Sequence, residues 1–317
     1  KFYSWNAELD LAGQRLIYLG SHATTRFHPV TNSDPGAVWP TLSLTQDTET
    51  GSSGNTHEVR LQNDERLFGF LDYVVGYFHL TGSSTTTTTS QTVLEGYAPI
   101  LAPGNLSLFK VTNIVNTTPI YVAPGKDTES SIYGNIVAHL GEATELSAGL
   151  RRINFKNNAQ GLFISCTPAA YTAGTCTLTP RTNNNYDLNK TIYNVSLRHK
   201  FSDDLMVYVA SGSSARPPVR AIGNFSTAYS PLEIAHTTFG AETSKSYEAG
   251  FKTSWLDRRL RFNATYYHQD FSDYPYRAAG AGVYYININS SGQANRARFN
   301  FISAVPVKVD GVEAELS

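Results

Sequence analysis

Apolar and polar residues alternate along much of this chain, and the period of two predicts β-strands with two chemically different faces. In the clearest example, Tyr247, Phe251 and Trp255 fall on one face, and Glu248 and Lys252 fall on the other. After a short polar turn the alternation resumes in a second strand. The pattern therefore predicts a β-hairpin that is apolar on one side and charged on the other.

The same unit of strand, tight turn and strand recurs along the chain, and no segment shows the spacing of a helix of useful length. The pattern predicts about 11 strands, arranged as five hairpins and one final unpartnered strand. The predicted hairpins and the final strand cover residues 3–25, 58–80, 131–155, 193–212, 247–267 and 298–316.

The connections between these strands fall into two classes. Those inside the hairpins are short and rich in Gly, Asp and Asn, which tight turns require. Strict alternation of short and long connections is typical of a transmembrane antiparallel β-barrel with short periplasmic turns and long extracellular loops. We therefore predict an all-β fold in which residues 1–317 form part of such a barrel. The long connections cover residues 27–55, 81–130, 157–186, 214–244 and 273–297.

Composition is consistent with a membrane barrel. The 317 residues are 41% hydrophobic and 12% aromatic, which is too apolar for a disordered chain. A formal net charge of −1 argues against nucleic acid as a partner. The mean hydropathy is only −0.27, because barrel strands are apolar at alternate positions alone. We therefore predict a location in the bacterial outer membrane, in contact with membrane lipid and lipopolysaccharide.

The predicted strand count has a consequence for the size of the barrel. Single-chain bacterial barrels have an even number of strands. The chain begins inside a predicted strand and ends where another turn is due. We therefore expect it to be an internal stretch of a larger barrel.

Five segments form a distinctive series along the chain. The chain reads THEVRLQND at Thr56–Asp64 and FGFLDYVVGYFHL at Phe68–Leu80. It continues with VYVASGSSARPP at Val207–Pro218, ETSKSYEAGFKTSWLDRRLRFNATYYHQDFSDY at Glu242–Tyr274 and VDGVEAELS at Val309–Ser317. These segments span most of the chain and resemble, in the same order, segments of TonB-dependent receptors. The most specific match is the one at Glu242–Tyr274.

This resemblance implies a barrel of 22 strands whose lumen is closed by an N-terminal plug, of which this sequence would supply about half the barrel. It also implies uptake of a scarce ligand, such as a ferric siderophore, haem, cobalamin or a glycan. The energy would come from the TonB complex of a Gram-negative bacterium, acting through a plug and a TonB box that lie outside this sequence.

Two groups of residues are candidates for function. Charged residues on the predicted lumen face would contact a plug or line the ligand path, or would only balance one another in a polar interior. Arginine and aromatic residues in two long connections would bind an anionic chelate or a sugar, or would serve loop packing and lipopolysaccharide contact. The lumen-facing candidates are Glu58, Arg60, Arg198, Glu248, Lys252 and Arg261, with Glu313 and Glu315. The ligand-binding candidates are Arg216, Arg220, His236, Tyr274, Tyr276 and Arg277.

The sequence offers little sign of other chemistry. The eight histidines have no metal-binding spacing, and no catalytic motif is present. We therefore expect no cofactor, no metal and no enzymatic activity. Cys166 and Cys176 lie close together in one long connection, and in an oxidising compartment they would form a disulfide.

Two other functions are compatible with a barrel. A passive porin would lack a plug and would fold a loop, such as residues 81–130, into its lumen. A surface-anchored adhesion protein would use its Thr-rich loops to bind cells or matrix. Neither is excluded by the residues themselves.

Overall fold

The computed structural model describes residues 1–33, 42–94, 114–165, 177–178, 182–183, 185–218, 239–277, 283–288, 294–299 and 302–317. All regular elements in these ranges are β-strands. The first eight are β1 (Phe2–Leu11), β2 (Gln14–Phe27), β3 (Val30–Ser33), β4 (Leu42–Asn63), β5 (Leu71–Leu94), β6 (Ile114–Leu140), β7 (Thr144–Ser165) and β8 (Thr177–Leu178). The others are β9 (Thr182–Asn183), β10 (Tyr186–Ser202), β11 (Leu205–Arg216), β12 (Glu242–Trp255), β13 (Leu260–Arg277), β14 (Val283–Ile288), β15 (Ala294–Phe299) and β16 (Ile302–Leu316).

The main sheet is an antiparallel meander. Its strands follow the order β1-β2-β4-β5-β6-β7-β10-β11-β12-β13-β16, so each long strand pairs with the next long strand in the sequence. Short strands join its margins, since β3 pairs with β4 while β8 and β9 pair with β7. β14 and β15 form a separate hairpin. The all-β antiparallel prediction and the expected number of long strands are thus confirmed.

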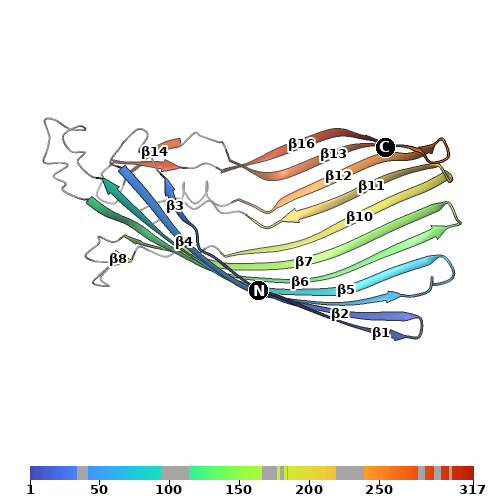
Figure 1. Ribbon diagram of the computed structural model, residues 1–317, viewed down its shortest axis with the longest axis horizontal. Coiled ribbons are helices and arrows are strands. Elements are labelled where there is room, and N and C mark those ends of the chain that lie inside the picture. Colours follow the sequence, from blue (N-terminus) through green and yellow to red (C-terminus); the bar gives the residue numbers. More distant parts are fainter. Residues whose placement is uncertain are drawn as a thin grey trace.

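Tight turns join the strands at one end of the sheet, on the right in Figure 1. The turn between β1 and β2 contains Ala12 (φ 50°) and Gly13 (φ 74°). Positive φ at both central residues gives a two-residue turn whose twist matches that of the flanking strands. Gly141, between β6 and β7, also has a positive φ of 74°. The predicted short turns therefore lie together at one end.

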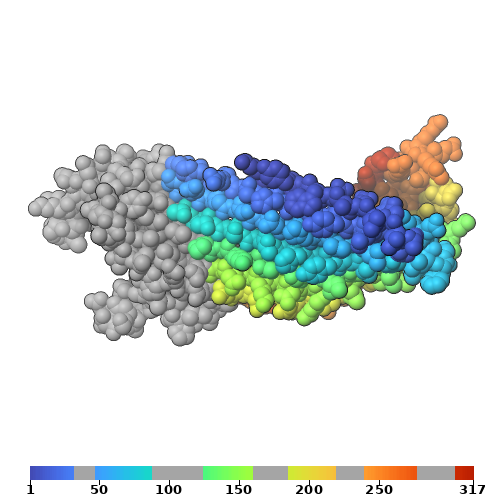
Figure 2. All heavy atoms as spheres, turned by 90° about the horizontal axis from the view of Figure 1, so that it is seen from below, coloured from blue at the N-terminus to red at the C-terminus, as the bar shows by residue number. Residues whose placement is uncertain are grey.

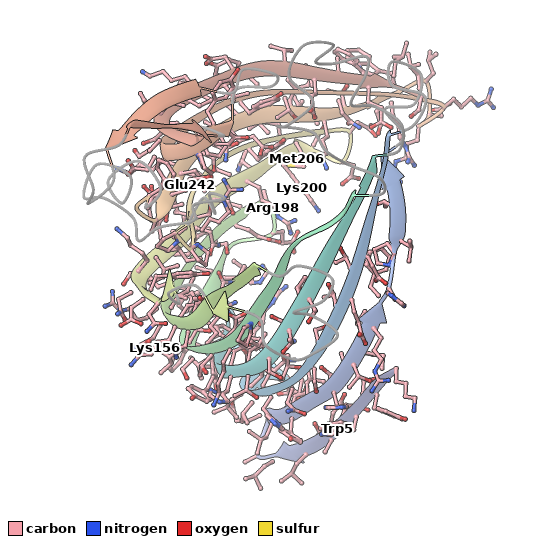
Figure 3. The ribbon with its side chains drawn as sticks, turned by 90° about the vertical axis from the view of Figure 1, so that its left-hand side faces the viewer. Trp5, Lys156, Arg198, Lys200, Met206 and Glu242 are labelled. Carbon is pink, nitrogen blue, oxygen red and sulfur yellow. The ribbon has the colours of Figure 1, made fainter. Side chains whose placement is uncertain are left out.

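The sheet curves into an open trough rather than a closed cylinder (Figure 3). β1 and β16 form its two edges, and no pairing in the described part of the chain joins them. Seen in atomic detail, β1 to β7 pack side by side into one continuous surface (Figure 2). The chain therefore forms part of a barrel wall, as predicted.

The two faces of this wall differ in chemistry. Residues directly opposite one another in an antiparallel pair point to the same side, and Val75, Gly134, Leu150 and Tyr193 form one such row across four strands. Lys156 is six residues, an even number, from Leu150 along β7, so its side chain lies on the same face. Figure 3 shows Lys156 on the convex side of the sheet. Large apolar side chains are exposed on it, including Val75, Leu150 and Ile136.

The concave face is polar, and Arg198, Lys200, Met206 and Glu242 lie on it in Figure 3. Leu188 is the one buried hydrophobic residue among those described. The described part of the chain therefore has almost no conventional core. Instead, its apolar side chains cover the convex face, as in a barrel whose outer surface meets lipid.

Several strands extend further than the sequence analysis predicted. β4 includes residues 42–55, β5 continues to Leu94, and β6 begins at Ile114, all within segments assigned to long connections. The reason is physical: where both faces of a strand meet water, apolar alternation is lost while pairing continues. The run Thr85–Thr89 lies inside β5, and threonine favours the extended conformation. Among the described residues, no helix is long and apolar enough to cross a membrane.

Candidate ligand-binding face

A network of charged and aromatic side chains covers the concave face of β4 to β7. Its first part centres on Glu58 of β4. Arg60 donates two hydrogen bonds to this carboxylate, at 2.9 and 3.0 Å. The hydroxyl of Tyr133, two strands away on β6, donates a further hydrogen bond to Glu58. The guanidinium of Arg60 and the phenol of Tyr133 thus supply three hydrogen bonds to one carboxylate.

The second part of this network centres on Arg151 of β7. Its Nη2 donates to Glu129 at 2.8 Å and its Nε donates to the Ser131 hydroxyl at 3.1 Å. The guanidinium also lies 5.3 Å from the ring centre of Phe78 and 6.0 Å from that of Tyr133, within the range of cation–π attraction. Tyr133 therefore links the two parts, and we call the six residues Glu58, Arg60, Glu129, Ser131, Tyr133 and Arg151 the concave network.

Glycine makes the position of Tyr133 possible. A Cβ on Gly76 of the neighbouring strand would lie 2.5 Å from the tyrosine ring, closer than any real contact. Removing the side chain lets the ring lie flat on the adjacent backbone, where it covers a weak site in the strand. The hydroxyl then reaches Glu58 across β5. Among the described glycines, three on this face show the arrangement: Tyr133 over Gly76, Tyr208 over Gly250 and Tyr267 over Gly311.

A second charged group lies near the short turns. Arg198 donates a hydrogen bond to Glu145 on the paired strand β7. Glu145 also lies 3.5 Å from Nδ1 of His139, whose Nε2 contacts Asp72 at 2.7 Å. Four side chains from β5, β6, β7 and β10 are therefore joined in one row. Such a row ties four strands together at the end where the hairpins close.

A third cluster lies on the same face at the opposite end of the strands. Arg216 of β11 pairs with the nearly buried Glu242 of β12, and its guanidinium carbon lies 5.8 Å from the ring centre of Tyr274. Next to this pair, the hydroxyls of Ser214 and Ser244 lie 2.8 Å apart. We call these five residues the mouth cluster, since they lie where the long connections begin.

A β-bulge brings Tyr274 into the mouth cluster. Pairing between β13 and β16 shifts register between Phe271 and Tyr274, and Asp273 has a φ of 58°. Before the bulge, Phe271 opposite Val307 points to the concave face, and after it Tyr274 does so instead. The extra residue therefore turns Tyr274 towards Arg216, which is a common use of bulges near functional sites.

The structure places the other candidates as follows. By register, Glu58, Arg60, Arg198, Glu248, Lys252 and Arg261 all occupy concave-face positions of their strands. Glu248 accepts a hydrogen bond from Tyr208, and Glu315 accepts one from Asn263 at 3.3 Å. Tyr276 lies opposite Ser303 and shares the face of Tyr274.

Some candidates cannot be compared with the structure. Arg220, His236, Cys166, Cys176 and the side chain of Arg277 lie outside the described residues. Among the residues that are described, no three His, Cys, Asp or Glu side chains form a metal-binding group.

Glu242 and the two serines of the mouth cluster were not among the candidates predicted from the sequence. The signal was weak because a Glu or Ser at a strand end is common and carries no spacing of its own. The partner of Arg216 is set by the pairing of β11 with β12, in which Arg216 lies opposite Glu242. Pairing register therefore supplied what the local pattern could not.

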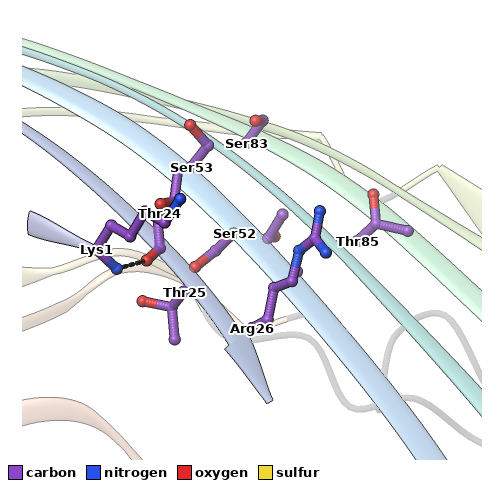
Figure 4. Close-up of a pocket in the computed structure, with 10 residues that line it drawn as sticks. Lys1, Thr24, Thr25, Arg26, Ser52, Ser53, Ser83 and Thr85 are labelled. Atoms are coloured by element: carbon purple, nitrogen blue, oxygen red, sulfur yellow. Dashed lines mark hydrogen bonds between the residues drawn. The ribbon is translucent and has the colours of Figure 1, made fainter. Parts of the chain in front are cut away.

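A hollow of about 570 Å³ lies between the end of β2 and the middle parts of β4 and β5 (Figure 4). Its lining is mainly hydroxyl groups, and Arg26 and Lys1 contribute its charges. The terminal ammonium group of Lys1 donates a hydrogen bond to the backbone carbonyl of Thr24 at 2.6 Å. No carboxylate or aromatic ring is among the lining residues.

Comparison with known proteins identifies the family. The sequence model described as "TonB dependent receptor-like, beta-barrel" matches residues 2–317. The chain belongs to the TonB-dependent receptor family. No curated protein matches it in sequence.

Solved structures of TonB-dependent receptors share the fold. The ferric yersiniabactin uptake receptor FyuA of Yersinia pestis is 11% identical, with a TM-score of 0.58, over 99% of this chain and 42% of FyuA. The siderophore receptor PiuA of Acinetobacter baumannii is 18% identical, with a TM-score of 0.58, over 99% of this chain and 43% of PiuA. The FpvA structure of P. aeruginosa bound to pyoverdines is 14% identical, with a TM-score of 0.56, over 100% of this chain and 37% of FpvA. The chain therefore spans less than half the length of these receptors.

Proposed function

We propose that this chain forms part of the wall of an outer-membrane receptor that takes up a scarce ligand with energy from the TonB system. The observation that carries the proposal is the separation of chemistry between the two faces. The convex face exposes apolar side chains such as Ile132 (63%) and Leu150 (62%), while the concave face carries paired charges. Such a wall separates lipid from a polar lumen, and membership of the TonB-dependent receptor family links it to active uptake.

Within this proposal, the ligand is an iron-bearing siderophore rather than haem, cobalamin or a glycan. FyuA, PiuA and FpvA, which share the fold, are described as a ferric yersiniabactin uptake receptor, a siderophore receptor and a receptor bound to pyoverdines. The mouth cluster is suited to an anionic chelate, because Arg216 is 51% exposed although it is paired with Glu242. Its guanidinium and the ring of Tyr274 offer a charge and a stacking surface side by side.

The proposed partners follow from this location. The convex face meets membrane lipid and lipopolysaccharide, and the TonB complex acts through parts of the receptor outside this chain. We further propose that the protein has no enzymatic activity, because the charged side chains described on its concave face are engaged in ion pairs and hydrogen bonds between strands.

The test is uptake of radioactive iron by cells that express the full receptor and lack other siderophore receptors. We expect saturable uptake of at least one ferric siderophore, and its loss when TonB is deleted. Arg216→Ala should weaken the apparent affinity by about tenfold, as is typical of losing an Arg contact. The matched control is Arg258→Ala, in the short turn at the other end of the sheet.

Two results would contradict the proposal. Entry that rises in proportion to concentration and survives deletion of TonB would indicate a passive porin. Binding to host cells or matrix without any growth defect under iron limitation would indicate an adhesion protein.

A further inference from the structure

The convex face of β6 and β7 changes from apolar to basic over a short distance. The convex-face residues of β6 include Leu140, next to the short turn, and then Ile136 and Ile132 at increasing distance from it. The run from Ile132 to Leu140 covers about 27 Å of strand, and a tilt of about 35–45° leaves about 19–22 Å of this along the barrel axis, most of the roughly 25 Å of a barrel's apolar band. The edge of the lipid-facing band on these strands therefore lies within about two residues beyond Ile132.

Basic side chains begin at this edge. Arg152 lies directly opposite Ile132, Lys156 lies opposite Thr128, and Lys126 lies opposite Asn158. All three cations point to the convex side and are exposed. We call Lys126, Arg152 and Lys156 the basic patch.

The charges of the basic patch are not neutralised within the described part of the chain. Arg152 donates one hydrogen bond, to the Thr191 hydroxyl at 3.2 Å. Asp187 on β10 faces the patch, since it lies opposite Lys156, but no ion pair among the described residues joins the two. Three cations and one carboxylate leave an excess of positive charge at the edge of the apolar band.

The charges on the convex face of β13 and β16 lack this excess. There, His268 contacts both Asp310 at 2.7 Å and Asp270 at 3.1 Å, and Lys308 lies 3.8 Å from Asp270. Cations and anions alternate in that sector, so it differs from the basic patch in its balance of charge.

An apolar groove lies directly below the basic patch. It encloses about 590 Å³, and it exists because the small residues Gly134 and Ala148 stand between larger neighbours. Its convex-face lining includes Val75, Ile136, Leu150, Tyr193 and Val195. Leu150 is two residues from Arg152 on the same face of β7, so groove and patch are continuous.

The geometry points to a binding site for one phosphorylated lipid on the convex face of β6 and β7. An acyl chain fills the groove at Gly134 and Ala148, and the headgroup phosphate pairs with Arg152 and Lys156, with Lys126 above them. Basic residues at a membrane surface attract anionic headgroups, and a guanidinium matches the geometry of a phosphate. This inference rests on the membrane insertion that the proposed function assumes, but not on transport.

The probe is dilauroyl phosphatidic acid, added to the full receptor in detergent and followed by native mass spectrometry. Dilauroylglycerol, which lacks the phosphate, and inorganic phosphate, which lacks the chains, are the comparison ligands. We expect phosphatidic acid to be retained and the other two not. The variant Arg152→Ser/Lys156→Ser should weaken its binding by about thirtyfold, given the usual contribution of two basic residues near a lipid surface.

Two further variants separate specific binding from general attraction. Lys245→Ser/Lys308→Ser removes the same charge from convex-face positions elsewhere and should leave binding unchanged. Gly134→Leu fills the groove and should weaken binding with every cation in place. This substitution fits the strand, because its Cβ would make an ordinary contact of 3.5 Å with Val75. Folding of each variant is checked by the different electrophoretic mobility of heated and unheated barrel.

The outcomes distinguish the two proposals. Equal losses in both double variants would replace the site by non-specific electrostatics, and displacement of the lipid by inorganic phosphate would reduce it to an anion site. Either result, or a folded barrel that retains no lipid, overturns the lipid site and leaves the proposed function intact. A receptor that does not enter lipid vesicles at all would instead contradict the proposed function.

Discussion

The two faces of β6 carry opposite chemistry within single residue steps. On the convex side, the apolar side chains of Ile132 and Ile136 are exposed, whereas on the concave side Tyr133 and Ser131 belong to the concave network. In a water-soluble protein the apolar face would be buried in a core. Among the residues that the structure describes here, almost none is buried, so the apolar side chains form an outer surface suited to lipid and not an interior core.

The largest effect should come from placing a charge on the convex face at mid-height. Ile136→Arg should lower the free energy of unfolding by about 2–4 kcal/mol, as found for arginine at the middle of a lipid-facing band. The matched control is Val137→Arg, one residue further on and on the concave face opposite Asp72. That arginine meets water and a carboxylate, so its cost should be much smaller. Urea unfolding of the receptor in lipid vesicles measures both, and equal costs would refute the assignment of faces.

A smaller effect should follow from adding a side chain at one of the glycines that tyrosine rings cover on the concave face. Gly76→Val would push a side chain into the ring of Tyr133, now 2.5 Å from the ideal Cβ position, and overpacking of this kind costs about 1–3 kcal/mol. Adding Tyr133→Ala should recover part of that loss, because the clash then disappears. Additive effects in this double-mutant cycle would mean that the ring does not rest on Gly76.

These two faces were predictable because lipid imposes a strict period of two. Tyr247, Phe251 and Trp255 alternate with Glu248 and Lys252, and the structure pairs their strand with the following one as expected. Sequence reasoning worked wherever one side of a strand meets lipid and the other meets water.

Alternation no longer predicts a strand where both of its faces meet water. The half of β5 that is remote from the short turns, with Thr85–Thr89, shows no alternation of apolar and polar residues, although it is still paired. The mouth cluster was also only partly predictable. Arg216 and Tyr274 were identified as candidates by residue type, but their proximity depends on a register and a bulge that no local pattern encodes.

A further prediction concerns the charges of the concave network. Arg151→Met keeps the length of the side chain but leaves Glu129 without its 2.8 Å partner. Because both groups are partly exposed to the lumen, water compensates for much of the loss, and we expect destabilisation of about 1 kcal/mol. The cost should decrease further when Glu129→Gln is added, since the unpaired charge is then removed. A loss as large as that of Ile136→Arg would show that the network lies in a dry interior and not in a wet lumen.

The smallest effect on stability should come from deleting Ser272 and Asp273 together, yet this change exchanges the two faces locally. Asp273 occupies the left-handed region at a φ of 58°, so its removal relieves strain of about 1 kcal/mol while a bulge is lost. Tyr274 would then directly follow Phe271, and regular pairing would turn it to the convex side, away from Arg216. We expect the barrel to fold with nearly wild-type stability and to bind the ligand as weakly as Arg216→Ala does. The matched change, deletion of Asp273 alone, also removes the bulge but leaves Tyr274 two positions after Phe271 and therefore on the concave face, so it should bind normally. Normal binding by the double deletion would mean that the orientation of Tyr274, and with it the mouth cluster, has no part in recognition.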